Sequence, residues 1–94
     1  MENLNQYDVV YFSTTWCGPC KVTKPIIEKA SNENAINTRL FTVDEEEGGS
    51  DIASKFGVRA VPTIIFFKDG EEVGRKTGST NEKEFIELYH SYSK

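Results

Sequence analysis

Two cysteines separated by Gly18-Pro19 stand at the junction of a strand pattern and a helix pattern, and this junction most constrains the fold. Residues 9–12 are an apolar run, typical of a strand buried on both faces. The segment after Cys20 places its apolar residues at helical spacing. Because only two residues separate the cysteines, both sulfurs lie within one turn and can form and reopen a small disulfide ring. The spacing predicts a redox dithiol at a helix start, where free N–H groups and the helix dipole favour a thiolate.

The remaining segments alternate between strand and helix patterns. Strands are expected over residues 8–13, 38–44 and 63–67 and through Val73, Arg75 and Thr77, and helices over residues 17–34, 51–56 and from about residue 80. The order β-α-β-α-β-β-α predicts one α/β domain over residues 1–94. We expect a four-stranded mixed sheet with helices on both faces, a parallel βαβ crossover and an antiparallel terminal hairpin.

Local signals mark the element boundaries. Ser50 is expected to cap the second helix, and Asp69-Gly70 predicts a tight hairpin. Pro25 is expected to kink the first helix. Either Ser79 or Asn81 is expected to cap the last helix. The buried face of that helix is expected to consist of Phe85, Leu88, Tyr89 and Tyr92.

Composition and charge disfavour several classes of function. The net charge of −4 and the lack of a basic tract weigh against nucleic-acid binding. The first twenty residues lack a cationic start and a long apolar run, so neither a signal peptide nor a membrane span is expected. Two cysteines in such a chain predict a reducing, cytoplasmic compartment and a transient disulfide. A metal site is not expected, because structural zinc takes four ligands and only His90 adds to the two cysteines.

With these elements in place, the chain resembles the thioredoxin family from about residue 8 to its C-terminus. The resemblance rests on Trp16-Cys17-Gly18-Pro19-Cys20-Lys21, Pro25, Val61-Pro62-Thr63, Phe67-Lys68-Asp69-Gly70 and Gly78. It implies a thioredoxin-like fold in which Cys17 is the exposed nucleophile and Cys20 the buried resolving thiol. It also implies that Pro62 is cis and faces the disulfide.

The resemblance further implies a substrate-binding surface and supporting residues. Val61 would offer backbone groups to an extended substrate peptide. Pro19 would stiffen the turn, and Lys21 would add a positive charge near the thiolate. The small and apolar residues expected to carry the substrate chain are Trp16, Gly18, Ala60, Val61, Pro62 and Gly78.

The implied activity is the reduction of disulfides in substrate proteins. The Cys17 thiolate would attack the substrate disulfide, and Cys20 would resolve the mixed disulfide. In the family, a Gly-Pro pair between the cysteines goes with a reducing potential. No organic cofactor is expected. The electrons would come from a separate NADPH-dependent flavoenzyme of the thioredoxin reductase type, and the chain is expected to be monomeric.

The chain departs from the family pattern in three ways. Thioredoxins usually begin with an additional strand and helix, but little precedes Asp8, so residues 38–44 are expected to form an open edge of the sheet. The family's buried aspartate aligns with Tyr11, and the lysine that accompanies it aligns with Leu40. Tyr11 is expected to pack in the core with its hydroxyl paired. Proton removal from Cys20 is therefore expected to use water, the departing sulfur or the Tyr11 hydroxyl.

Two alternative functions follow from the same residues. A glutaredoxin-type reductase that uses glutathione is favoured by the short N-terminal region. It is disfavoured by the Trp-Cys-Gly-Pro-Cys motif and by the lack of an evident set of basic residues to bind the glutathione carboxylates beyond Lys21 and Arg59. A thioredoxin-fold binding subunit of a larger assembly would not need the dithiol at all.

Overall fold

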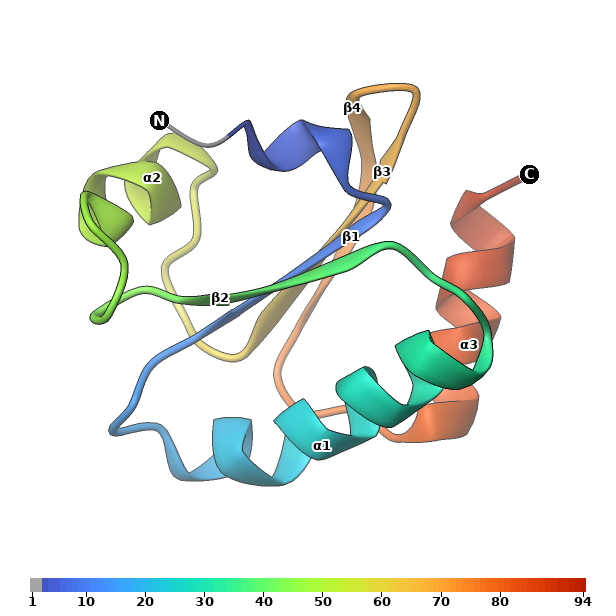
Figure 1. Ribbon diagram of the computed structural model, residues 1–94, viewed down its shortest axis with the longest axis horizontal. Helices are drawn as coiled ribbons and strands as arrows, with labels where there is room; N and C mark the ends of the chain where they lie inside the picture. Colours follow the sequence, from blue (N-terminus) through green and yellow to red (C-terminus); the bar gives the residue numbers. More distant parts are fainter. Residues whose placement is uncertain (1–2) are drawn as a thin grey trace.

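The computed structural model describes residues 3–94 and contains the expected alternation of strands and helices (Figure 1). In chain order the elements are η1 (Leu4–Gln6), β1 (Val9–Ser13), α1 (Gly18–Glu33), β2 (Thr38–Thr42), α2 (Gly49–Lys55), β3 (Thr63–Lys68), β4 (Glu71–Thr77) and α3 (Glu82–Tyr92). The strands form one sheet in the order β2-β1-β3-β4. β1 is parallel to β2 and antiparallel to β3, and β3 is antiparallel to β4. The predicted mixed sheet, parallel crossover and antiparallel hairpin are confirmed.

Helices cover both faces of the sheet, as predicted. Successive side chains of a strand point to opposite faces. Val10 and Phe12 of β1 therefore join the apolar cluster under η1 and α2, whereas Val9 and Tyr11 join the cluster under α1 and α3 (Figure 1). All five positions of β1 and the first five of β3 are buried. This two-sided burial explains why both strands are apolar runs rather than alternating patterns.

β2 lies at the edge of the sheet, as expected, and pairs only with β1 among the strands of residues 3–94. Phe41 is buried, and the other four residues of β2 are half-buried. The strand ends at Thr42, two residues earlier than predicted. The N–H groups of Glu45 and Glu46 both donate to the Thr42 carbonyl at 3.1 Å, and this turn ends the strand.

The predicted cap of α2 was wrong. The N-cap is Gly48 rather than Ser50, and it has a left-handed φ of 67°. Such a conformation favours glycine because a Cβ atom would be strained there. A Cβ atom at the following residue, Gly49, would lie 2.1 Å from the carbonyl oxygen of Val43. The two glycines therefore form the tight turn that leads into α2.

The β3–β4 hairpin and α3 form where the sequence predicted them. Asp69 and Gly70 have φ values of 53° and 82°, as a tight hairpin turn requires. α3 begins after Asn81, whose side chain accepts a hydrogen bond from the Glu84 N–H at 2.8 Å. Phe85 is fully buried, and the other three predicted face residues pack half-buried on the same cluster. None of the helices in residues 3–94 has the length and apolar character needed to cross a bilayer.

We expect Gly49→Ala to lower the free energy of unfolding by about 3 kcal/mol, the upper part of the usual range for overpacking. The added methyl would collide with the backbone of Val43. Gly48→Ala is the matched control, because nothing lies within 4 Å of its Cβ position. It should cost only the left-handed backbone strain, about 1 kcal/mol. Equal losses for the two variants in urea unfolding would contradict the close approach at Gly49.

Candidate functional site

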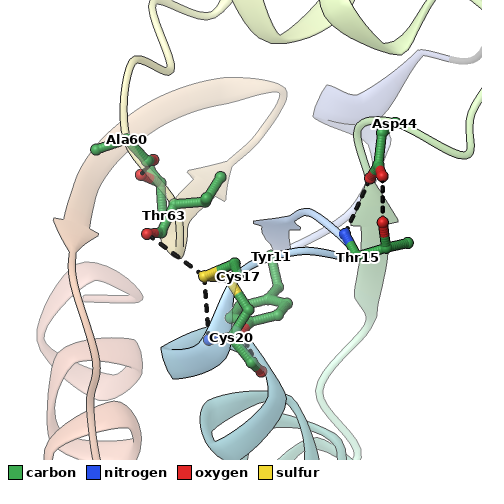
Figure 2. Close-up of a disulfide and its surroundings, with 8 residues drawn as sticks. Tyr11, Thr15, Cys17, Cys20, Asp44, Ala60 and Thr63 are labelled. Atoms are coloured by element: carbon green, nitrogen blue, oxygen red, sulfur yellow. Dashed lines mark hydrogen bonds between the residues drawn. A yellow bond between two sulfur atoms is a disulfide. The ribbon is translucent and has the colours of Figure 1, made fainter.

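The Cys-Gly-Pro-Cys segment forms the start of α1 (Figure 2). Cys17 is the N-cap residue, and its Sγ accepts a hydrogen bond from the Cys20 N–H at 3.2 Å. Pro19 lies in the first turn of α1, where backbone N–H groups have no helical partner. The missing N–H of Pro19 therefore costs no helical hydrogen bond. Cys17 and Cys20 form a disulfide with their Cα atoms 5.3 Å apart. The prediction that both sulfurs lie within one turn is confirmed.

The expected exposure of Cys17 is not seen in this disulfide form. Cys17 is 5% exposed and Cys20 is 2% exposed. The Sγ of Cys17 lies 3.7 Å from the carbonyl oxygen of Val61, which precedes β3. A disulfide sulfur carries no proton, so this is a packing contact. The neighbouring Trp16 is 74% exposed.

The loop at residues 60–62 forms the other side of the site (Figure 2). The peptide bond before Pro62 is cis, as the resemblance implied. The Thr63 hydroxyl donates to the Ala60 carbonyl at 2.5 Å, and the Gly78 N–H donates to the Pro62 carbonyl at 2.8 Å. These bonds hold the loop in place beside Cys17. Ala60 is exposed, Val61 and Gly78 are half-buried, and Pro62 is buried.

An open groove with a volume of about 450 Å³ extends from Trp16 to α2. Of the residues predicted to bind substrate, Trp16, Ala60 and Val61 line this groove, whereas Gly18, Pro62 and Gly78 do not. The groove also contains side chains that sequence reasoning did not assign to substrate binding, including Ala53, Val58 and Arg59. Val58 and Arg59 could have been found from their position next to Ala60. Ala53 comes from α2, and its place depends on the tertiary fold.

Tyr11 fills the position at which the family's buried aspartate aligns. It is fully buried, and its hydroxyl donates to the backbone carbonyl of Cys20 at 3.0 Å. Burial raises the pKa of Tyr11 to about 12, so the hydroxyl stays protonated at neutral pH. Leu40 lies directly opposite Tyr11 in the β1–β2 register. The expected packing role of Tyr11 is confirmed, and its hydroxyl is placed as a donor rather than as a base for Cys20.

Asp44 joins the turn before the motif to the turn after β2 (Figure 2). Its Oδ1 accepts the Thr15 N–H at 3.0 Å, and its Oδ2 accepts the Thr15 hydroxyl. The hydrogen bond from the Thr15 side chain and then that from its backbone lower the pKa of Asp44. Sequence reasoning missed this pair, because no local pattern relates two residues that are 29 positions apart.

Comparisons with known proteins agree with this geometry. A family model described as thioredoxin matches residues 1–91. Thioredoxin Asp f 29 of Aspergillus fumigatus is 42% identical over 72 residues, which cover 76% of this chain and 64% of that protein. The chain thus spans just under two thirds of the Aspergillus protein. Thioredoxin of Homo sapiens is 44% identical over 75 residues, which cover 80% of this chain and 70% of that protein.

Solved structures give the same result for the fold. A mutant thioredoxin from Halobacterium salinarum has a TM-score of 0.82 and 34% identity, with 98% of this chain and 80% of that chain covered. A thioredoxin from Fasciola hepatica has a TM-score of 0.78 and 35% identity, with 90% of this chain and 79% of that chain covered. The expected thioredoxin-like fold is confirmed.

We expect Tyr11→Phe to lower the free energy of unfolding by about 1 kcal/mol, the usual net value of one hydrogen bond. The variant keeps the buried ring and removes only the hydroxyl that bonds to the Cys20 carbonyl. Urea unfolding of the disulfide form measures the difference. A loss of several kcal/mol would show that the hydroxyl supports more than this one contact.

Asp44 should contribute to the acid sensitivity of the fold. Because its pKa is lowered in the folded state, its bonds to Thr15 stabilise the protein above the ordinary carboxyl pKa of 3.8. That stability is lost as the pH falls through the lower folded value. We therefore expect the stability advantage of the wild type over Asp44→Asn to shrink between about pH 5 and pH 2. Glu47→Gln removes a charge from the same loop and serves as the control. An advantage that stays constant with pH would rule out this role for Asp44.

Proposed function

The chain belongs to the thioredoxin family, whose members are protein-disulfide oxidoreductases, and on this basis we propose that it reduces disulfides in substrate proteins. The observation that carries the proposal is the Cys17–Cys20 disulfide at the N-terminus of α1. It lies beside the exposed Trp16 and the loop that contains cis-Pro62. A dithiol in this position can exchange electrons with a disulfide that a partner presents at the surface.

The reaction begins from the dithiol form. The Cys17 sulfur lies at the helix N-cap, where it accepts a hydrogen bond from the Cys20 N–H in the disulfide form, and the helix dipole would stabilise its thiolate. The Cys17 thiolate attacks a substrate disulfide, a mixed disulfide forms, and the first substrate sulfur leaves as a thiolate. The Cys20 thiolate then attacks the Cys17 sulfur, the Cys17–Cys20 bond forms, and the second substrate sulfur leaves as a thiolate. Solvent protonates both released thiolates.

The substrate chain would lie along the groove beside the disulfide. Trp16, Ala60 and Val61 line this groove and provide its apolar contacts. Val61 would pair its backbone groups with an extended substrate segment. The same contact surface would continue over Gly18 and Gly78. Pro19 would keep the turn stiff, and the charge of Lys21 would favour the thiolate.

We infer from the family that a separate thioredoxin reductase-type flavoenzyme supplies the electrons. The chain would act as a monomer in the reducing cytoplasm, where the dithiol can be regenerated. The match to the thioredoxin family model supports this activity over the glutathione-dependent alternative. Reduction driven by a thioredoxin reductase, compared with reduction driven by glutathione and its reductase, separates the two electron sources.

We expect the wild-type protein to catalyse insulin reduction, measured as turbidity from the released B chain. Cys17→Ser should reduce the rate to background because the attacking sulfur is absent. Cys20→Ser should react once and remain joined to the substrate as a mixed disulfide, visible by mass spectrometry. If Cys17→Ser formed that adduct instead, the two roles would be reversed. Full biological activity of the double variant would indicate a non-catalytic binding subunit.

A further inference from the structure

A second cavity borders Cys20 rather than Cys17, and its volume is about 240 Å³. Cys20 is 2% exposed, and it is one of the residues that line this cavity. The side chains on the cavity wall that bear on the chemistry of Cys20 are Thr14, Lys21, Lys24 and Glu45. They come from α1, from the turn after β1 and from the turn after β2.

Cys20 must become a thiolate before it can resolve a mixed disulfide. Burial disfavours the charged form of a thiol, so the surroundings of Cys20 must compensate for lost hydration. The core beside α1 does not provide this compensation. The Tyr11 hydroxyl donates to the Cys20 carbonyl, and the opposing Leu40 is apolar. The Asp44 carboxylate is occupied by two hydrogen bonds from Thr15.

Lys24 is placed to provide a positive charge. It lies four residues after Cys20 on α1, and residues at this spacing are neighbours on one face of a helix. Both residues line the same cavity. Lys24 forms no salt bridge with any residue in the described range 3–94, so its charge is not neutralised by a partner there. Lys21 lines the same cavity as a second cation.

The other charged groups around Cys20 also determine whether its surroundings favour or disfavour the thiolate. Glu45 is the one carboxylate on the described wall of this cavity, and its charge opposes a thiolate. Glu46 is instead paired with Arg39 at 2.9 Å. The loop at residues 60–62 contributes no charged side chain. Lys21 and Lys24 outnumber the single carboxylate on the wall itself, while Asp44 adds a second negative charge next to the wall through its bonds to Thr15.

The cavity is also suited to hold water. This cavity is open to solvent and has room for several water molecules. Water there would carry the proton of Cys20 to solvent.

We propose that Lys24 stabilises the Cys20 thiolate across this cavity and thereby sets the rate at which the mixed disulfide is resolved. The inference rests on the proposed reductase function. Cys20 loses its proton to cavity water, and its thiolate attacks the Cys17 sulfur. The Cys17–Cys20 bond forms as the bond between Cys17 and the substrate sulfur breaks. The electron pair leaves on the substrate sulfur, which takes a proton from solvent. Lys24 acts through its charge alone.

The test follows the two steps separately with a small aromatic disulfide whose released thiolate absorbs visible light. The first release reports the attack by Cys17, and the second reports resolution by Cys20. We expect Lys24→Gln to slow the second release about threefold at neutral pH and to shift its pH profile upward by about 0.5 unit. The first release should change less. Lys24→Arg keeps the charge and should restore the second release.

Two further variants isolate the effect of the Lys24 charge. Lys29→Gln removes a charge from the same helix but lies outside the cavity, so it should leave the second release unchanged. Glu45→Gln should accelerate the second release under this proposal, whereas it would slow it if Glu45 were the base for Cys20. An unchanged second release in Lys24→Gln, or a slower one in Glu45→Gln, would overturn the proposal. The absence of any second release in the wild type would instead contradict the reductase function.

Discussion

The antiparallel pairing of β1 with β3 is the interaction on which the rest of this site depends. In the register of the two strands, Phe12 lies opposite Thr63. The end of β1 therefore lies beside the start of β3, and the segments that extend from them meet. One segment leads into the Cys-Gly-Pro-Cys turn and the other contains cis-Pro62. Residues 44 positions apart in sequence, Cys17 and Val61, come into contact for this reason.

The same central strand sets the environment of Cys20. The β1–β2 register places Tyr11 against Leu40, so an aromatic and an aliphatic side chain occupy the positions at which the resemblance aligned a buried aspartate and its lysine. This pair adds apolar burial under α1 and contributes no ionisable carboxylate to Cys20. The polar surroundings of Cys20 lie instead in the cavity between α1 and the turns that follow β1 and β2. Asp44 bonds to Thr15 and so connects those two turns.

Several features could be predicted because their signals are local. The apolar run of β1 and the Asp69-Gly70 turn each depend on a few neighbouring residues, and both were placed correctly. Local chemistry also narrowed the cap of α3 to two residues, and the structure selects Asn81. The start of α2 was placed wrongly. Ser50 has the chemistry of a cap, but the close approach of Gly49 to the preceding turn decides where the helix begins. That approach brings the start of α2 against the residue that follows β2, and the helix preferences of single residues do not predict it.

The sequence by itself determined the order of elements, the position of the dithiol at a helix start and the two cysteines that can react. These depend on spacing and on backbone preferences that act over a few residues. Tertiary structure alone decided how deeply Cys17 is buried, which residues of α2 enter the groove, and which charges share a cavity with Cys20. The physical reason is that burial and electrostatic surroundings depend on distances across the sheet, and strand register sets those distances.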